Sequence, residues 1–246
     1  MTRLATAMAH APVVLAGAGL LASAGHAVPA VTTWPWLRRT VSASLHGERD
    51  GTTVAVTFDD GPHPEATPLL LDLLRDLDVP ATFFVLGQNV ARWPDVARRI
   101  AGEGHEVAVH GWTHRNHLRL APSTVVAEDR RTAALVTDVC GVRPRLARPP
   151  YGVVTAGDLA AARAIGLRLL LWTAWGRDWE ERATPATILG RLDPGLRAGS
   201  TLLLHDSDCT SAPNSWRATL AAVPEVVRRV RAAGGDLVTA STHLAG

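Results

Sequence analysis

The chain has 246 residues and contains no lysine, so all 25 of its cationic side chains are arginines. This absence excludes a catalytic lysine of the kind that holds phosphates in a nucleotide-binding loop or forms a Schiff base with a substrate. The sequence also lacks internal repeats, a low-complexity linker and a basic cluster, and its formal net charge is only +2. Such a charge gives no indication of a nucleic acid as partner.

Asp, Glu and Arg are also missing from residues 4–25. The apolar run APVVLAGAGLLASAG in this segment follows Arg3, which is typical of a signal peptide, and Ala22-Ser23-Ala24 offers small residues for cleavage. The run is equally long enough for a membrane anchor of about 20 residues. Trp34 and Trp36 would then lie at the membrane interface.

The residues after this run argue against simple export. Arg38 and Arg39 place more positive charge after the run than before it. A short buried N-terminal helix is a further interpretation of the segment. We expect residues 1–40 to be a signal or membrane-anchor segment, and residues 41–246 to be the domain that carries the function.

Cysteine is scarce, with only Cys140 and Cys209 present. Their spacing is not that of a metal site. The two side chains could form a single disulfide in an oxidising compartment or remain free thiols, and the sequence leaves both alternatives open.

Short β-rich runs alternate with amphipathic helical stretches between residues 52 and 243. The predicted strands are Thr53–Phe58, Thr82–Leu86, Glu106–His110, Arg145–Arg148, Leu167–Trp172, Thr201–His205 and Asp236–Thr239. Two helices are expected to start at Thr67-Pro68 and Thr184-Pro185, where an N-cap residue precedes a proline suited to the first turn. Seven alternations without a glycine-rich nucleotide turn predict an α/β fold, a (β/α) barrel of about seven parallel strands. A doubly wound open sheet is the alternative.

The run VTFDDGPHP places two carboxylates, Asp59 and Asp60, at the end of an apolar strand. There they repel each other and lose hydration, so something must offset that cost. A capped turn with a structural salt bridge accounts poorly for two acids at this place. Further ionisable side chains follow the ends of other predicted strands, namely His110, His114, Arg148, Asp178 and His205. Because the carboxyl ends of barrel strands meet on one rim, we expect these groups to gather there.

The spacing of His110 and His114 in HGWTH presents two imidazoles to one side, as zinc sites often require. The pair is weak evidence by itself in a chain with ten histidines. An aspartate from a neighbouring strand end would complete a face of two histidines and one carboxylate with open positions. One aspartate would then be neutralised by a divalent cation. Zinc fits these ligands best, and cobalt or nickel would also fit.

The second aspartate must stay ionised, and Arg148 is the available cation to hold and orient it. Such a carboxylate, beside water activated by a metal, is placed to act as general base. His205 follows an apolar strand, where a histidine is more often a buried structural residue. Asp178, on the preceding loop, favours a catalytic role for His205, because a carboxylate on one ring nitrogen stabilises the imidazolium that a general acid needs.

The motifs TFDDGPHP, HGWTH, RPPYG, GRDW and LLLHD occur in the order that is characteristic of polysaccharide deacetylases, the NodB-homology carbohydrate esterases of family 4. Residues 52–243 resemble this family, and five motifs in order make the resemblance specific. It implies a distorted (β/α) barrel of the NodB type. The resemblance also implies a role for each site residue. Asp59 would be the base, positioned by Arg148, and His205 would be the acid, with Asp178 as its partner. The metal ligands would be Asp60, His110 and His114, the backbone N–H of Tyr151 would bind the oxyanion, and Trp179 and Leu203 would line the acetyl pocket.

The activity implied by the resemblance is metal-dependent hydrolysis of acetyl groups from N-acetylated glycans, such as chitooligosaccharide or peptidoglycan, with O-acetyl esters as further substrates. The partner would be an acetylated glycan, and the protein would be secreted or membrane-anchored facing the cell wall. A related amidohydrolase acting on a non-sugar C–N bond is one alternative, and a catalytically silent carbohydrate-binding relative is another.

Two positions depart from the family pattern. Gly111 stands where the family usually has Ser or Thr, whose hydroxyl braces the loop, so the rigidity of this loop is in question. Trp175 stands where many members carry an acid three residues before the Asp of the fourth motif, which would reshape the sugar groove.

Overall fold

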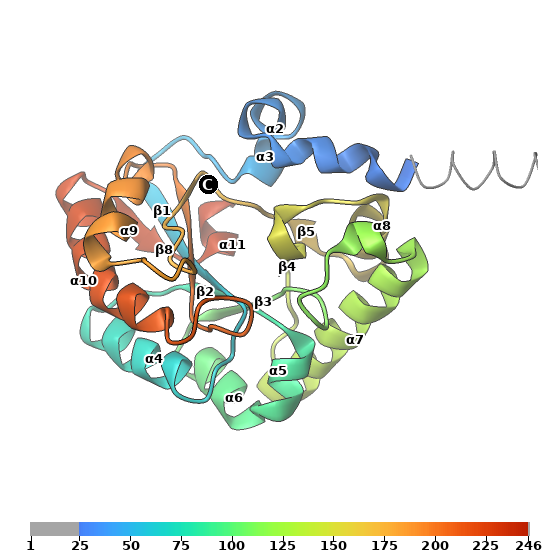
Figure 1. Cartoon of the computed structure of the whole chain (residues 1–246), viewed down its shortest axis with the longest axis horizontal. Coiled ribbons are helices and arrows are strands. Elements are labelled where there is room, and N and C mark those ends of the chain that lie inside the picture. The colour runs from blue at the N-terminus through green and yellow to red at the C-terminus, as the bar shows by residue number, and fades with distance from the viewer. Residues whose placement is uncertain (1–24, 246) are drawn as a thin grey trace, which may run out of the picture.

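The structure is a computed structural model that describes residues 25–245 (Figure 1). Its centre is a sheet of eight strands in the order β5-β4-β3-β2-β1-β7-β6, with β8 paired beside the start of β1, and every pairing is parallel. The strands are β1 (Thr53–Asp59), β2 (Thr82–Val85), β3 (Glu106–Val109), β4 (Leu146–Ala147), β5 (Arg168–Leu169), β6 (Ala174–Trp175), β7 (Thr201–His205) and β8 (Asp236–Val238).

Helices surround the sheet, as expected for strands that are buried on both faces (Figure 1). The long ones are α4 (Ala66–Asp76), α6 (Pro94–Gly102), α7 (Pro122–Cys140), α8 (Ala156–Ile165), α9 (Pro185–Leu192) and α10 (Trp216–Ala232). The shorter ones are η1 (Val28–Thr33), α2 (Pro35–Val41), α3 (Ala43–His46), α5 (Gly87–Arg92), η2 (His117–Arg119), η3 (Pro150–Gly152), η4 (Asp193–Gly195) and α11 (Ala240–His243).

The two edge strands, β5 and β6, are consecutive in the chain and are joined only by residues 170–173. Five peptide steps span at most about 18 Å, so the two edges of the sheet must lie close together. The sheet therefore curls into an incomplete barrel, whose two edges are joined by this segment without pairing to each other. This confirms the predicted (β/α) barrel, and the alternative of an open doubly wound sheet is wrong.

The predicted strand Leu167–Trp172 is wrong as one continuous element. The apolar run divides into β5, which pairs with β4, and the crossing segment 170–173. The chain then enters β6, which pairs with β7 and was missed in the sequence because it has only two residues. Every other predicted strand matches an observed one to within one or two residues, and β1 extends one residue beyond its prediction, to Asp59.

The two expected helix starts had different outcomes. Thr184 caps α9, and its hydroxyl accepts a hydrogen bond from the amide of Thr187, as predicted. The start at Thr67-Pro68 is wrong, since α4 begins at Ala66. The hydroxyl of Thr67 instead donates to the buried carboxylate of Asp206, 2.5 Å away. Leaving a buried carboxylate without a donor costs more free energy than leaving the first turn of a helix uncapped.

The N-terminal helices η1, α2 and α3 pack on the barrel, and Arg38 is their buried anchor, with 3% of its surface exposed. Its guanidinium donates hydrogen bonds to the carbonyl oxygens of Thr32 and Trp172 and to Nδ1 of His46, at 3.2, 2.7 and 3.1 Å. The predicted apolar run up to residue 24 lies outside the described residues. Among residues 25–245, no helix has both the length and the apolar character needed to cross a bilayer.

Candidate active site

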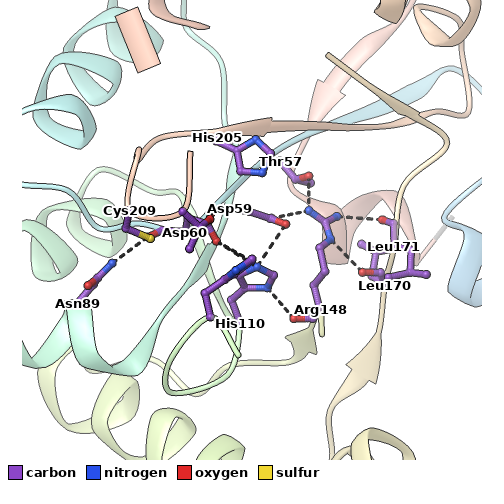
Figure 2. Close-up of polar contacts among 12 residues, drawn as sticks. Thr57, Asp59, Asp60, Asn89, His110, Arg148, Leu170, Leu171, His205 and Cys209 are labelled. Carbon is purple, nitrogen blue, oxygen red and sulfur yellow. Dashed lines mark hydrogen bonds and ion pairs between the residues drawn. The ribbon is translucent and has the colours of Figure 1, made fainter. Parts of the chain in front are cut away.

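The carboxyl ends of β1, β3, β4 and β7 bring the ionisable groups together on one rim of the barrel (Figure 2). Asp59 is the last residue of β1 and lies opposite His205 of β7 in the parallel register. Asp60 follows in the left-handed region, with φ 76°, which separates the two carboxylates onto different partners. A left-handed backbone conformation in a residue other than glycine is strained and is typical of functional sites.

Arg148 is fully buried and holds Asp59. Its Nη1 lies 2.6 Å from Oδ1 of Asp59 and 2.8 Å from the hydroxyl oxygen of Thr57 (Figure 2). Its remaining nitrogens donate to the carbonyl oxygens of Leu170 and Leu171 in the crossing segment, at 3.1 and 2.9 Å. Every nitrogen of the guanidinium is thus paired, as a buried charge requires. The face of the guanidinium lies 3.9 Å from the ring centre of Phe84.

Asp60, His110 and His114 form the group that could hold a metal ion, with one ligand atom from each lying within 4.8 Å of the others. Oδ1 of Asp60 is 3.3 Å from Nε2 of His110 and 3.2 Å from Nε2 of His114. This oxygen is buried and has no hydrogen-bond partner, whereas Oδ2 accepts from the hydroxyl of Thr210 at 2.8 Å. An unpartnered oxygen between two ring nitrogens is what a cation would satisfy.

The protonation pattern of the imidazoles also fits a metal. Nδ1 of His110 lies 2.7 Å from the carbonyl oxygen of Arg148, which can only accept, so Nδ1 carries a proton and Nε2 is the nitrogen that faces Asp60. Burial lowers the pKa of His110, but the carboxylates of Asp59 and Asp60 outweigh burial and raise it, so a metal would compete with a proton for Nε2. Burial lowers the pKa of His114 to about 4, which keeps that ring neutral at pH 7. Burial raises the pKa of Asp60, but His110 and His114 outweigh burial and hold it below its usual range. The carboxylate is therefore ionised, as a ligand must be.

The loop after His110 is braced without the family hydroxyl. The carbonyl oxygen of Gly111 accepts from the amide of Gly87 at 3.1 Å and from the hydroxyl of Thr132 at 3.0 Å. The carbonyl of Trp112 accepts from the amide of Gln88 at 3.0 Å. Gly111 itself has φ 77°, a conformation that favours glycine. Backbone pairing with the start of α5 thus replaces the missing side-chain brace.

His205 lies across the cavity and is held by Asp178. Its Nδ1 is 2.8 Å from Oδ1 of Asp178, and its own amide donates to Oδ2 at 2.7 Å. Thr219 of α10 donates to the same Oδ2 at 2.7 Å. Burial lowers the pKa of His205, but the carboxylate of Asp178 outweighs burial and raises it to about 9. The ring is therefore an imidazolium at neutral pH, with Nε2 free of Asp178.

A cavity of about 220 Å³ opens between these groups. Eight of the ten side chains singled out in the sequence line it, namely Asp59, Asp60, His110, His114, Tyr151, Trp179, Leu203 and His205. Arg148 and Asp178 lie behind it, each bonded to a lining residue. Trp172 and Trp175 complete the aromatic wall, with ring centres 5.6 Å apart, and Trp175 stands 5.1 Å from Trp179.

Several residues of the site were missed in the sequence. Thr210 and Ser211 line the cavity from the loop after β7, while Thr57 and Thr219 hold Arg148 and Asp178. The run SDCTS directly after LLLHD is the one signal that could have indicated Thr210, since it follows a strand that ends on the same rim. Thr57 and Thr219 gave no signal, because a threonine within a strand or helix is ordinary.

The cysteines have no part in this chemistry. Both Cys140 and Cys209 are free, so the disulfide alternative is wrong. Burial and the neighbouring carboxylate of Asp60 raise the pKa of Cys209 to about 12, and the thiol therefore stays protonated.

Comparisons with known proteins agree with this arrangement. The polysaccharide deacetylase family model matches residues 46–170. The chitooligosaccharide deacetylase of Bradyrhizobium sp. (strain ANU 289) is 38% identical over 196 residues, which are 75% of this chain and 89% of that protein. The N-acetylmuramic acid deacetylase PdaC of Bacillus subtilis (strain 168), which acts on peptidoglycan, is 35% identical over 188 residues, or 76% of this chain and 38% of that protein.

Solved structures agree as well. A crystal structure of a peptidoglycan N-acetylglucosamine deacetylase superposes with a TM-score of 0.74 at 28% identity, covering 80% of this chain and 90% of that one. With the family model, the close relative and the fold in agreement, the chain belongs to the polysaccharide deacetylases and is a hydrolase of this family.

Proposed function

We propose that this deacetylase removes acetyl groups from N-acetylated glycans by metal-dependent hydrolysis, with Asp59 as general base and His205 as general acid. The observation that supports this most directly is the pair of opposed groups in one cavity. On one side stands a carboxylate fixed by Arg148, and on the other an imidazole with its pKa raised to about 9. A carboxylate held in place as base and a protonated imidazole as acid are what amide hydrolysis needs.

Asp60, His110 and His114 would hold the metal ion. Bound there, a divalent cation would polarise the acetyl carbonyl and make water a stronger nucleophile. Zinc suits two imidazoles and one carboxylate, and cobalt or nickel would also fit. The neutral imidazole of His114, the hydrogen bond that orients His110 and the unpartnered oxygen of Asp60 are the features of this chain that support the site.

The proton steps fall to the chain's own residues. Asp59 accepts a proton from the attacking water as the new C–O bond forms, and Arg148 keeps this carboxylate in place through the 2.6 Å ion pair. The tetrahedral oxyanion would be met by the backbone N–H of Tyr151, whose φ of 61° turns the chain at the cavity wall. His205 then donates its proton to the leaving nitrogen as the C–N bond breaks. The products are acetate and a free amine on the sugar.

The acetyl group itself would lie against Trp179 and Leu203. Trp179 packs edge-on to the imidazole of His205, with ring centres 5.3 Å apart, and Leu203 precedes His205 by two residues on β7. An apolar pocket beside the acid holds a methyl group and excludes water from the side of the leaving nitrogen.

Acetate release from chitohexaose and from peptidoglycan fragments tests the proposal. The protein is first stripped with a chelator and then supplied with zinc, cobalt or nickel singly. We expect activity to return with a metal, and Asp59→Asn to reduce kcat by roughly 10²–10⁴-fold while the bound metal, measured by atomic absorption, is unchanged. Asp60→Asn should lose both the activity and the bound metal.

Two results would contradict the proposal. Metal binding without acetate release from any glycan would favour a non-sugar amide as substrate. Full activity in Asp59→Asn would remove the base from the mechanism.

A further inference from the structure

A second groove lies beside the catalytic cavity and shares Trp175 with it. Its volume is about 520 Å³, and it runs between the N-terminal helix α2, the loop after α9 and the start of β7. Trp36, Arg39, Arg191, Arg197 and Ser200 are among its lining residues. Because one indole forms a wall of both spaces, the groove and the cavity are adjacent at Trp175.

The groove carries more positive than negative charge. Arg39 and Arg197 both bind the carboxylate of Glu48, each at 2.5 Å, so two guanidinium groups share one acid. Arg191, which also lines the groove, binds Glu180 at 2.7 Å, and Arg177 outside the lining approaches the same carboxylate to 3.8 Å. Each cluster therefore keeps one uncompensated positive charge.

Burial and the nearby guanidinium groups, that of Arg38 first, lower the pKa of His46 to about 4. This imidazole also lines the groove and is thus neutral at pH 7. The positive charge of the groove then comes from arginines alone, which bind carboxylates through paired N–H donors.

The groove also offers surfaces for a sugar ring. Trp36 is 67% exposed and Trp175 is 36% exposed, which is unusual for side chains of this size. Exposed indoles stack against the apolar faces of pyranose rings. Ser200, another lining residue, has a buried hydroxyl with no hydrogen-bond partner among the described residues.

We propose that this groove is an extended subsite for glycan strands whose sugars carry carboxylates, such as the lactyl groups of muramic acid in peptidoglycan. The inference rests on the proposed deacetylase function and specifies its substrate class. Neutral chitooligosaccharides would use the aromatic surfaces of the groove but offer nothing to its arginines. The groove thereby distinguishes an acidic strand from a neutral one of the same length.

The test compares two substrates with the full chain. One is chitohexaose, and the other is a peptidoglycan strand of equal length from which the peptides have been removed, so that its lactyl carboxylates are free. In the double variant Arg39→Gln/Arg197→Gln, we expect KM for the acidic strand to rise by roughly two- to tenfold, the effect of losing one or two exposed charge pairs. KM for chitohexaose and kcat for both substrates should stay the same.

A matched control is available in Arg98→Gln/Arg228→Gln. Arg98 is 55% exposed and paired with Asp95, and Arg228 is 65% exposed and paired with Glu225, compared with 51% for Arg39 and 55% for Arg197. This control removes the same net charge away from the groove. It should leave both KM values unchanged if the effect is local, and a rise equal to that of the groove variant would overturn the inference.

Calorimetric binding of the acidic strand to Asp59→Asn protein gives a readout that needs no turnover. Weaker binding in the groove variant, more marked at low salt, supports the subsite. Equal binding of both strands, or equal losses for both, overturns it. A complete lack of acetate release with either substrate would refute the proposed function, and the binding comparison would still decide on the groove.

Discussion

Each buried charge in the site is held by a partner from another strand or helix. Asp59 of β1 is paired with Arg148 after β4, and Asp178 is paired with His205 of β7. Burying such pairs costs desolvation that the ion pair alone does not repay, so additional hydrogen bonds must complete them. Thr57 supplies one to Arg148 and Thr219 supplies one to Asp178. The site is thus positioned by hydroxyls as much as by charges.

The pH dependence of deacetylation should reveal the pair of His205 and Asp178. The general acid must be protonated, and its pKa is raised to about 9, so kcat should hold through neutral pH and fall as pH rises above about 9. In Asp178→Asn the main cause of that raised pKa is lost. The fall in kcat should then begin at a lower pH, nearer the ordinary range of histidine.

Rate profiles between pH 6 and pH 10 measure this shift. Thr219→Val keeps the carboxylate and serves as a control, so its alkaline limb should move much less than that of Asp178→Asn. An unchanged limb in Asp178→Asn would mean that His205 does not supply the proton.

Gly111 should tolerate a side chain poorly. A Cβ there would lie 3.3 Å from Nε2 of His117 and 3.4 Å from the carbonyl oxygen of Thr113, and φ is 77°. We expect Gly111→Ala to lower the free energy of unfolding by about 1–2 kcal/mol. Gly190→Ala in α9 should have the opposite sign, a gain of up to about 1 kcal/mol, because nothing lies within 4 Å of its Cβ position.

Urea denaturation of both glycine variants measures the two changes. A stabilised Gly111→Ala protein would show that the loop can adopt another backbone conformation.

The sequence predicted the position of a site residue only where a charged side chain stood at the end of a predicted strand. Asp59, Asp60, His110 and His205 could be placed on one rim because parallel strands end together. The role of Gly111 in the loop could not be predicted, since the amides that brace it belong to α5, more than twenty positions away. Hydrogen bonds between backbone groups of distant segments cannot be predicted from residue types.

At the scale of elements, the segment 170–173 joins the two edges of the sheet without being a strand. Several of its carbonyl oxygens point to side chains instead of a neighbouring strand. Arg148 donates to Leu170 and Leu171 from the site, and Arg38 donates to Trp172 from the N-terminal helix α2. The sequence predicted one long strand here because the run is apolar apart from Arg168, and apolar character does not show where pairing changes from one edge to the other.

Arg38 should therefore stabilise the barrel although it lies before the expected domain boundary. Arg38→Met keeps most of the aliphatic length but removes three hydrogen bonds, and we expect a loss of about 2 kcal/mol in unfolding free energy. Arg39→Met, at an exposed neighbouring position, should change stability by less than about 0.5 kcal/mol.

Urea denaturation decides between these expectations. A protein shortened to residues 41–246 loses the same contact with Trp172 and should be destabilised at least as much as Arg38→Met. Equal stability of the shortened and the full protein would show that η1 and α2 are dispensable for the barrel.

Over the whole molecule, buried titratable groups oppose each other in their effect on stability. Burial lowers the pKa of His46, His105 and His243, so these rings resist protonation and the folded state loses stability as the pH falls below about 6.5. Burial raises the pKa of Asp129 and Asp206 to about 7, which acts in the opposite sense. The histidines and the aspartates therefore change the free energy of unfolding in opposite directions as the pH falls. Single variants are needed to separate the two contributions.

Asp129 of α7 is the aspartate that best tests this effect, because it is 3% exposed and its Oδ1 has no hydrogen-bond partner among the described residues. Its pKa is about 7 in the folded chain, compared with the ordinary 3.8. Above pH 7 the folded state must bury the charge. Between pH 7 and pH 4 it takes up a proton that the unfolded state does not, and stability rises.

Asp129→Asn lacks this titration. The difference in unfolding free energy between the variant and the natural chain should favour the variant by about 1–3 kcal/mol more at pH 8 than at pH 5. Urea denaturation at the two pH values, with the metal content kept constant, measures it. A difference that does not change with pH would mean that the Asp129 carboxylate is paired or solvated in the folded chain, and the pH dependence of stability would then come from Asp206 and the histidines.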